Sequence, residues 1–268
     1  MNLTGTRVVV TGASRGIGAQ LAERLAARGA RVVLVARSRD AISDLAARLG
    51  GEAFPADLAD PAAIAPLVRA IETEGPVNVL VNNAGVDLTG AFVDLDPERI
   101  LALIAVNLVA PMLLSRSVIP TMRVRGKGHI MNLSSLAGTN ALPGLAPYST
   151  SKAGLSHFTA ALRAECKGTG VTTTLAEIGP VESDMMESLH SHPPTERALS
   201  RLRRLRLATE LDMGHVVAAL VDAIEHERRH VRLPRRNAIF PILTEGPRRM
   251  TELLLTGVRA QDDSEVAQ

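Results

Sequence analysis

The stretch TGASRGIG, residues 11–18, decides the fold. It follows the apolar run 7–12 and precedes a segment with apolar residues at every fourth position, which predicts a helix over 17–28. A glycine-rich turn between a strand and a helix lets the backbone approach a pyrophosphate, and the free N–H groups of the helix start attract its charge. A tight turn without a ligand is the alternative. The predicted nucleotide-binding residues here are Gly12, Ser14, Arg15, Gly16, Ile17 and Gly18.

Short apolar runs and helical segments alternate along the rest of the chain. The further runs are 31–37, 52–58, 77–85, 128–135, 171–179 and 230–234, and a late helix is predicted over 213–224. Continuous apolar strands are typical of a parallel sheet whose two faces are both covered by helices. We therefore predict an α/β fold with a doubly wound, seven-stranded parallel sheet in one domain, residues 1–258, and a disordered tail over 259–268.

The composition fits a soluble globular chain, with 46% apolar and 22% charged residues. A net charge of +2 gives no strong case for nucleic acid. Cys166 is the single cysteine, which excludes an internal disulfide and fits the cytoplasm. The amino end has no secretory pattern, and the longest apolar run, 100–114, is expected to be too short to span a membrane.

The end of the second run carries the signal for cofactor choice. Folds that prefer NAD usually have an acidic residue there, to accept the ribose 2′-hydroxyl. This chain has Ala36 instead, followed by Arg37 and Arg39, and Arg15 lies in the glycine-rich turn. Guanidinium groups match a 2′-phosphate, so the pattern predicts NADP(H). Solvated surface charge is the alternative, and Asp40 lies close by.

The only tyrosine, Tyr148, and Lys152 are spaced i, i+4 and share a helix face. Lowering the phenol pKa from about 10 to about 7 requires roughly 4 kcal/mol, which one cation at about 4 Å supplies in a partly shielded site. We therefore predict that Lys152 makes Tyr148 an acid–base group near neutral pH. Taken alone, such a pair is common by chance.

Together the motifs resemble the classical short-chain dehydrogenase/reductase family. The matching features are the glycine-rich turn 11–18, Asp57, NNAG at 82–85, Asn107, Ser135 and the Tyr148/Lys152 pair. They follow one another in the family's order. Ser135 is chosen over Ser134 because thirteen residues separate it from Tyr148, as in the family.

The resemblance implies a Rossmann-type fold and a hydride transfer between NADP(H) and a carbonyl or secondary alcohol. The catalytic residues would be Asn107, Ser135, Tyr148 and Lys152, and further cofactor contacts would come from Asp57, Leu58, Asn83, Ala84, Gly85, Gly179, Val181 and Ser183. Tyr148 and Lys152 would also bind the cofactor. One departure is that Ile178 precedes Gly179 and Pro180 follows it, where the family usually has Pro-Gly.

Asn107 also carries a local argument. Pro111 has no N–H, so within one helix the Asn107 carbonyl loses its usual partner and becomes available to water. A plain proline kink is the alternative. In the resembling family, the corresponding asparagine holds a water that connects the lysine to solvent.

The region after the sixth run is implied to cover the substrate, over about 182–212. Its apolar residues favour a lipophilic substrate, and its arginines, in 199–207, fit either a solvated face or an anionic carrier. An extra helix is predicted over 246–258, packing on a partner subunit or on the lid; membrane contact is a weaker alternative. HERRH, 226–230, has the spacing of zinc peptidases, but helical geometry turns both histidines away from the apolar face, and HSH, 190–192, is interpreted as loop polarity, so we expect no metal site.

These observations predict an NADP(H)-dependent reductase of a lipophilic ketone, 3-oxoacyl or steroid-like molecule. A homo-oligomer, dimer or tetramer, is expected from the resemblance only. The alternatives are an NAD-linked alcohol dehydrogenase and a nucleotide-binding regulator that keeps the fold without turnover.

Overall fold

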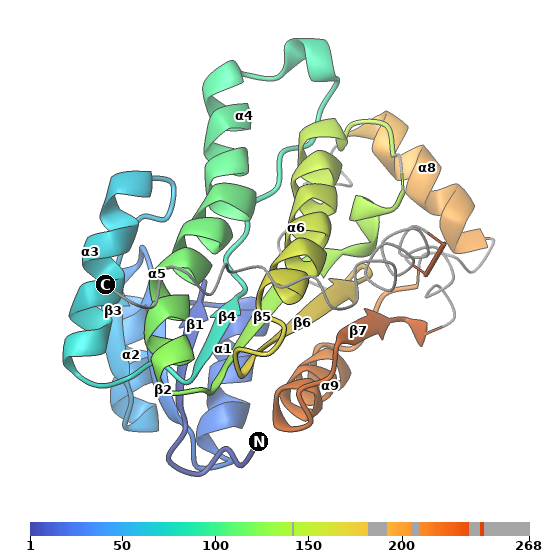
Figure 1. Cartoon of the computed structure of the whole chain (residues 1–268). Coiled ribbons are helices and arrows are strands. Elements are labelled where there is room, and N and C mark those ends of the chain that lie inside the picture. The colour runs from blue at the N-terminus through green and yellow to red at the C-terminus, as the bar shows by residue number, and fades with distance from the viewer. Residues whose placement is uncertain (141, 182–191, 205–208, 236–241, 244–268) are drawn as a thin grey trace, which may run out of the picture.

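A computed structural model describes residues 1–140, 142–181, 192–204, 209–235 and 242–243. Its centre is one seven-stranded sheet in the order β3-β2-β1-β4-β5-β6-β7, and all neighbouring strands pair in parallel (Figure 1). The strands are β1 (Arg7–Thr11), β2 (Arg31–Ala36), β3 (Glu52–Pro55), β4 (Val79–Asn82), β5 (Gly128–Ser135), β6 (Val171–Ile178) and β7 (His230–Leu233). The order reverses between β1 and β4, and ligands of open α/β sheets bind at such a point, outside the carboxyl ends of the strands.

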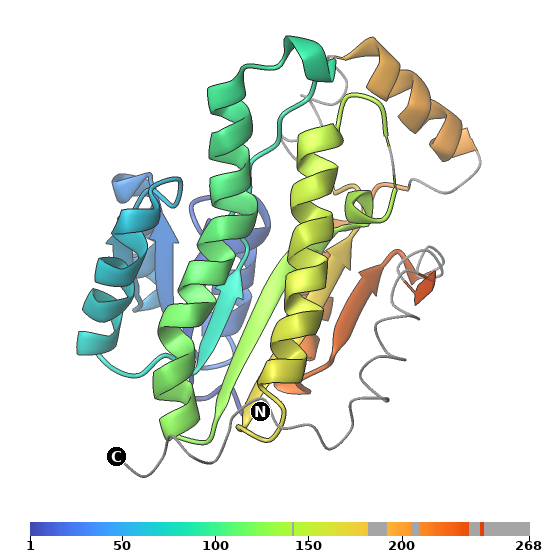
Figure 2. The ribbon, with the colours of Figure 1, turned by 45° about the horizontal axis from the view of Figure 1, so that its top comes forward.

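Helices cover both faces of the sheet (Figures 1 and 2). One apolar cluster joins the sheet to α1 (Gly16–Ala26), α2 (Arg39–Leu49) and α9 (Met213–Glu225). A second cluster on the opposite face joins it to α3 (Pro61–Thr73), α5 (Ala110–Val124) and α6 (Ala146–Glu165). The remaining described helical elements are η1 (Phe92–Asp94), α4 (Pro97–Ile104), η2 (Ala105–Val109), η3 (Leu136–Gly138) and α8 (Pro193–Arg204).

The apolar runs follow directly from this double cover. Val8 and Val10 belong to the cluster with α1, whereas Val9 between them belongs to the cluster with α3 and α5. Because successive side chains point to opposite faces, a strand buried on both sides needs an apolar residue at every position. The predicted fold class is confirmed.

Element bounds match the sequence predictions at most places. The helix predicted over 17–28 is α1, Gly16–Ala26, and that over 213–224 is α9, Met213–Glu225. The run 77–85 is a strand only at Val79–Asn82, because the residues after it bend into the site described below. The predicted helix 246–258 and tail 259–268 lie outside the described residues, and the single-domain boundary stays a prediction.

The apolar run 100–114 belongs to a longer helical stretch, Pro97–Val124, formed by α4, η2 and α5. By length and composition alone this stretch could cross a membrane, so the expectation that it is too short does not hold for the whole helix. Its inner face is nevertheless fully buried against the rest of the protein, at Leu103, Leu114, Val118 and Met122. Since 44% of the most apolar window is buried and core helices of soluble proteins pass the same composition test, the stretch is weak evidence for a membrane span.

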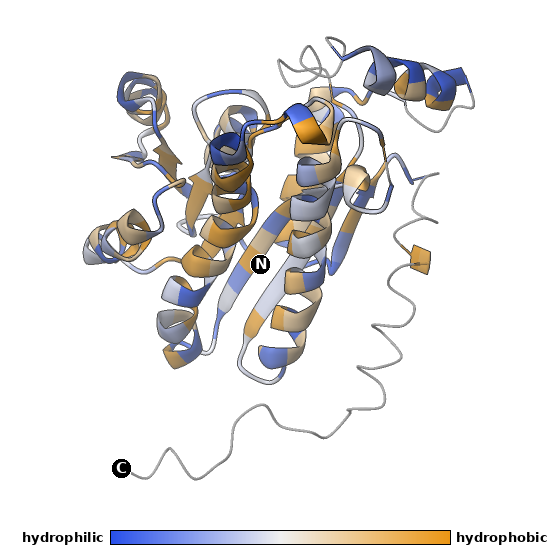
Figure 3. Ribbon diagram, turned by 90° about the horizontal axis from the view of Figure 1, so that it is seen from above, coloured by the Kyte–Doolittle hydropathy of each residue, from blue (hydrophilic) through white to orange (hydrophobic). Residues whose placement is uncertain are grey.

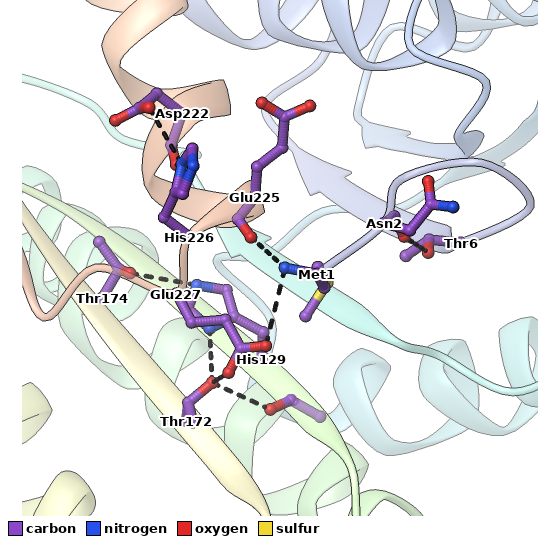
Figure 4. Close-up of polar contacts among 11 residues, drawn as sticks. Met1, Asn2, Thr6, His129, Thr172, Thr174, Asp222, Glu225, His226 and Glu227 are labelled. Atoms are coloured by element: carbon purple, nitrogen blue, oxygen red, sulfur yellow. Dashed lines mark hydrogen bonds and ion pairs between the residues drawn. The ribbon is translucent and has the colours of Figure 1, made fainter.

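A buried histidine, His129, lies near the amino end of strand β5 (Figure 4). Its Nδ1 lies 2.8 Å from the Thr172 hydroxyl, and its Nε2 lies 3.1 Å from the Thr174 hydroxyl. The Thr172 hydroxyl also donates to a Glu227 carboxylate oxygen at 2.9 Å. Burial, aided by the nearby positive charge of the Met1 amine, lowers the pKa of His129 to about 4.

This pKa predicts acid sensitivity of the fold. The unfolded chain protonates its histidine near pH 6.5, whereas native His129 stays neutral to about pH 4. The contribution of neutral His129 to the free energy of unfolding is therefore fully present above pH 6.5. It is lost as the pH falls toward 4, and the loss amounts to about 3 kcal/mol in total. Denaturant unfolding at a series of pH values should show this loss. His129→Gln should remove most of the slope, and the exposed His157→Gln should not. An equal slope in all three proteins would contradict the assignment.

Candidate functional site

The glycine-rich turn occupies the carboxyl end of β1 at the point where the strand order reverses. Gly12 has φ +66, and a Cβ placed on it would lie 2.8 Å from the Ala84 Cα. A Cβ on Gly18 would overlap the Gly12 carbonyl and lie 2.5 Å from Asn83 Nδ2. These two positions therefore require glycine, because any side chain would push the turn apart. α1 begins directly behind the turn, with Arg15 at its N-cap, no capping side chain and no acidic residue in its first turn.

The loop after β4 is fastened to this turn by hydrogen bonds. The Thr11 hydroxyl accepts from the backbone N–H groups of Asn83, at 3.1 Å, and Ala84, at 3.0 Å. In return, the Asn83 amide donates to the carbonyl oxygens of Thr11, at 2.9 Å, and Gly12, at 3.2 Å. The predicted residues of both loops are thus held together as one surface.

A cavity of about 850 Å³ extends from this surface across the carboxyl ends of the strands. The predicted site residues that line it are Gly12, Ser14, Arg15, Gly16, Ile17, Arg37, Asp57, Leu58, Asn83, Ala84, Gly85, Ser135, Tyr148, Lys152, Gly179 and Val181. Gly18 and Asn107 are buried behind its wall, and Ser183 lies outside the described residues. The sequence therefore brings almost the whole predicted set to one cavity.

One end of the cavity is cationic. Arg15 and Arg37 are exposed and line it, next to Ala36, whose methyl group leaves no carboxylate at the end of β2. Arg39 and Asp40, in the first turn of α2, are not among the lining residues. Of the three predicted arginines, Arg15 and Arg37 are therefore the two placed to meet an anionic group. The nearby carboxylate of Asp40 does not line the cavity.

The other end carries Ser135, Tyr148 and Lys152. The Ser135 hydroxyl faces the Tyr148 phenol closely enough to lower its pKa, whereas Ser134 is occupied by the Lys152 carbonyl at 2.8 Å and the Ser156 hydroxyl at 2.9 Å. Lys152 Nζ donates to the Leu133 carbonyl at 3.0 Å and lies 5.8 Å from the centre of the Tyr148 ring. A hydroxyl, a phenol and an ammonium group thus meet at the end of β5.

The prediction that Lys152 lowers the pKa of Tyr148 is wrong for this structure. Burial raises the pKa of Tyr148 to about 12; the Ser135 hydrogen bond opposes this rise, and the Asp87 charge adds to it. Burial also lowers the pKa of Lys152 to about 8. Both groups lose hydration, and this cost exceeds the attraction that a simple ion pair would give. Tyr148 is therefore a protonated donor at neutral pH.

Asn107 lies in η2, a π-helical turn in which the Ala110 N–H bonds to the Ala105 carbonyl. Such turns accompany interruptions of the α-helical pattern, and Pro111, which lacks an N–H, follows directly. The Asn107 side chain accepts from the Val86 N–H and donates to the Val86 carbonyl, both at 2.8 Å. It also donates to the Ser151 hydroxyl at 3.2 Å. Asn107 thus fixes the loop after β4 to α6; its catalytic role stays a prediction.

Most of the apolar lining was not among the predicted site residues. It includes Val86, Val106, Leu133, Leu136, Leu142, Leu145, Ile178 and Met213, together with Leu199 and Leu202, which fall in the region 182–212 that the resemblance implied as the substrate cover. Leu199 and Leu202 come from α8, which lies at the rim of the molecule with mixed hydrophilic and hydrophobic residues (Figure 3). Thr195 anchors this helix, because its buried hydroxyl donates to the Pro143 carbonyl at 2.7 Å. Only the i+3 spacing of the two leucines could have indicated a shared face.

The HERRH motif forms no single site. α9 ends at Glu225, His226 is its exposed C-cap, and His230 already belongs to β7. The described residues contain no group of three or more His, Cys, Asp or Glu side chains that could hold a metal ion. His192, from HSH, contacts the Thr195 hydroxyl at 2.8 Å instead.

Comparison with known proteins agrees with this geometry. The short chain dehydrogenase family matches residues 6–194. The chain belongs to this family. Its members of known structure include a metagenomic short-chain oxidoreductase in complex with NADP, which is 41% identical with a TM-score of 0.64, over 67% of this chain and 83% of that one.

Among curated proteins of this kind, the chain is 39% identical to the ketoacyl reductase HetN of Nostoc, over 91% of this chain and 83% of the relative. It is 34% identical to the 3-oxoacyl-[acyl-carrier-protein] reductase FabG of Escherichia coli, over 82% and 91% of the two chains. The protein is thus a short-chain dehydrogenase/reductase, an oxidoreductase of a family that uses a nicotinamide cofactor.

Proposed function

We propose that this enzyme is an NADP(H)-dependent reductase of a ketone or 3-oxo group on a lipophilic molecule. The observation that supports this proposal most directly is one continuous cavity. It has Arg15 and Arg37 at one end and Tyr148 among leucines at the other. The cationic end suits a 2′-phosphate, and the apolar end suits a lipophilic carbonyl compound. The names of the two relatives, both ketoacyl reductases, support the 3-oxo group.

The residues of the site fit a dinucleotide and divide the chemistry between them. The bare backbone at Gly12 and Gly18 and the uncapped start of α1 suit a pyrophosphate. A reduced nicotinamide cofactor, when bound, supplies the hydride. Ser135 hydrogen-bonds the carbonyl oxygen of the substrate, and Tyr148 donates its phenolic proton to that oxygen as negative charge develops there. Lys152 places a positive charge beneath the phenol and offers its ammonium group to the cofactor ribose.

A panel of carbonyl compounds tests this proposal. Purified protein is mixed with NADPH and, separately, with an aryl ketone, a long-chain 2-ketone, a 3-oxo ester and a short polar ketone, and loss of the reduced cofactor is followed by absorbance. We expect turnover of the lipophilic compounds and faster turnover with NADPH than with NADH. No turnover with any compound, despite tight NADPH binding, would favour the non-catalytic regulator.

The NAD-linked alcohol dehydrogenase is the less favoured alternative. Alcohol oxidation needs a phenolate as base, and the pKa of Tyr148 at about 12 keeps the phenol protonated. Carbonyl reduction starts from the protonated phenol, and Ala36 leaves the end of β2 without the acidic residue that folds preferring NAD usually carry.

The pKa of Lys152 predicts the pH dependence of reduction. With a value of about 8, the ammonium is charged below pH 8 and loses its proton above it, whereas Tyr148 stays protonated over this range. We expect kcat/KM for ketone reduction to be constant below about pH 8 and to fall tenfold per pH unit above it. Lys152→Arg should move the fall to higher pH, because a guanidinium keeps its charge. A flat profile from pH 7 to 10 in the unaltered enzyme would contradict this role of Lys152.

We further propose that the enzyme works in the cytoplasm as a homo-oligomer. Phe92, Val93 and Leu101 are exposed on η1 and α4, and Met112 on α5 is 41% exposed. Exposed apolar side chains on consecutive helical elements are typical of an interface between subunits. Light scattering of the purified protein tests this proposal, since a mass of 28.4 kDa would show a monomer.

A further inference from the structure

Asp87 places a carboxylate in the cavity close to the reacting groups. It follows Gly85 and Val86 on the loop after β4, is half-buried, and lines the cavity together with Ser135 and Tyr148. None of the family motifs that identify the site includes this position. Its carboxylate is therefore a charge at the substrate end that those motifs do not account for.

The segment that carries Asp87 is held on both sides. Asn107 binds the N–H and the carbonyl of the preceding residue, Val86, at 2.8 Å each. The following residue, Leu88, is 3% exposed and anchors the chain in the core. Two residues further, the Gly90 N–H donates to the Gly144 carbonyl at 3.1 Å, which ties the segment to the loop leading to α6. The backbone that carries the carboxylate is thus fixed at the substrate end of the cavity.

The surroundings make this charge effective. The neighbouring cavity wall is apolar, from Val86, Leu142 and Leu145, and low polarity strengthens electrostatic interactions. The effect already reaches the phenol, since the Asp87 charge raises the pKa of Tyr148. A second negative charge brought by a substrate to this end of the cavity would meet the same field, whereas a hydroxyl or amide N–H could donate to the carboxylate.

We propose that Asp87 is a specificity-determining residue that excludes anionic substrates and selects neutral ones, such as esters or thioesters of 3-oxo acids, over the free acids. A free 3-oxo acid carries its carboxylate two carbons from the reacting carbonyl, and therefore close to Asp87 when the carbonyl oxygen meets Tyr148 and Ser135. Masking the acid as an ester or thioester removes that charge. The inference rests on the proposed reductase function and names the substrate class within it.

The test compares matched substrates, ethyl acetoacetate and acetoacetate, in four proteins. These are the unaltered enzyme, Asp87→Asn, which keeps the shape and removes the charge, Asp87→Ser as a smaller neutral variant, and Asp94→Asn as a control on exposed η1 outside the cavity. We expect the acid-to-ester ratio of kcat/KM to rise by about tenfold or more in both Asp87 variants, as removal of a like charge at close range implies. The ratio should stay unchanged in Asp94→Asn.

The outcomes separate this inference from the proposed function. Turnover of a neutral aryl ketone with NADPH tests the function alone. If that reaction proceeds but the acid-to-ester ratio is the same in every folded variant, Asp87 has no role in selection. A rise in Asp94→Asn as well would also overturn the inference, because the effect would then come from overall charge.

A pH readout distinguishes a charge effect from a change of shape. Among the described residues that line this end of the cavity with Tyr148, Asp87 on the loop after β4 and Lys152 on α6 are the titratable groups. Loss of the Asp87 charge should lower the pKa of the phenol, so alcohol oxidation should begin at lower pH in Asp87→Asn than in the unaltered enzyme. An unchanged onset would contradict the electrostatic basis of the selection.

Discussion

Replacement of Tyr148 by phenylalanine is expected to lower kcat for ketone reduction by at least about 100-fold, since positioned acid catalysis contributes about 10² to 10⁴. Phenylalanine keeps the ring against Lys152 and removes only the hydroxyl, which is the sole phenol of the chain. With the pKa raised to about 12, that hydroxyl carries its proton at every pH at which the enzyme would work. Steady-state kinetics with the best ketone of the panel measure the loss.

The control for this variant is cofactor binding. The phosphate and ribose contacts do not depend on the phenolic oxygen alone, so NADPH affinity, measured by fluorescence titration, should stay within about threefold. Ser135→Ala should cost less than Tyr148→Phe, because it removes a hydrogen bond to the substrate oxygen and leaves the proton donor in place. Retained turnover in Tyr148→Phe, with intact thermal unfolding, would reject Tyr148 as the acid.

The sheet could be predicted because a strand that is buried on both faces has apolar residues at consecutive positions of the sequence. Val8, Val9 and Val10 are all buried, although they point to different layers. The short strands β3 and β4 were predicted too long, since an apolar run does not show where backbone pairing stops. After Asn82, the chain turns to bond Thr11 and Gly12, which are remote in sequence.

The site residues also fall into two groups, those that a local sequence pattern predicts and those that only the fold brings together. The glycines and Arg37 were predictable because a turn between a strand and a helix leaves a local pattern, and Tyr148 and Lys152 because four residues form one helical turn. Leu142 and Asp87 were not, since they reach the site only through tertiary contacts such as the Thr195 bond to the Pro143 carbonyl. No local spacing marks them.

The pKa of Tyr148 shows a limit of reasoning from pairs of residues. Spacing alone placed a cation beside the phenol and predicted a lower pKa from Coulomb attraction. The fold buries Lys152 and half-buries Tyr148 at the end of β5, and desolvation then penalises the phenolate and the ammonium together. A sequence shows which charges are neighbours, whereas the surrounding layers decide how well each is solvated.

Replacement of Arg37 by aspartate is expected to reverse the cofactor preference, changing the NADPH-to-NADH ratio of kcat/KM by about 100-fold or more. A guanidinium fork that matches a 2′-phosphate is lost, and a carboxylate that repels it is introduced. The same carboxylate can accept a hydrogen bond from the 2′-hydroxyl of NADH, in the place where folds that prefer NAD carry an acid. Arg37 is exposed and lines the cavity directly after Ala36, so the substitution disturbs no packed contact.

Arg39→Asp is the matched control. Arg39 is also exposed and lies two residues further along the chain, but it starts α2 and does not line the cavity. The two variants carry the same change in net charge, so a long-range electrostatic effect would appear equally in both, and raised salt would screen it. A direct contact would appear only in Arg37→Asp. Equal NADPH preference in Arg37→Asp and the unaltered enzyme would refute the phosphate role and leave Arg15 as the remaining described arginine of the cavity that could meet a 2′-phosphate.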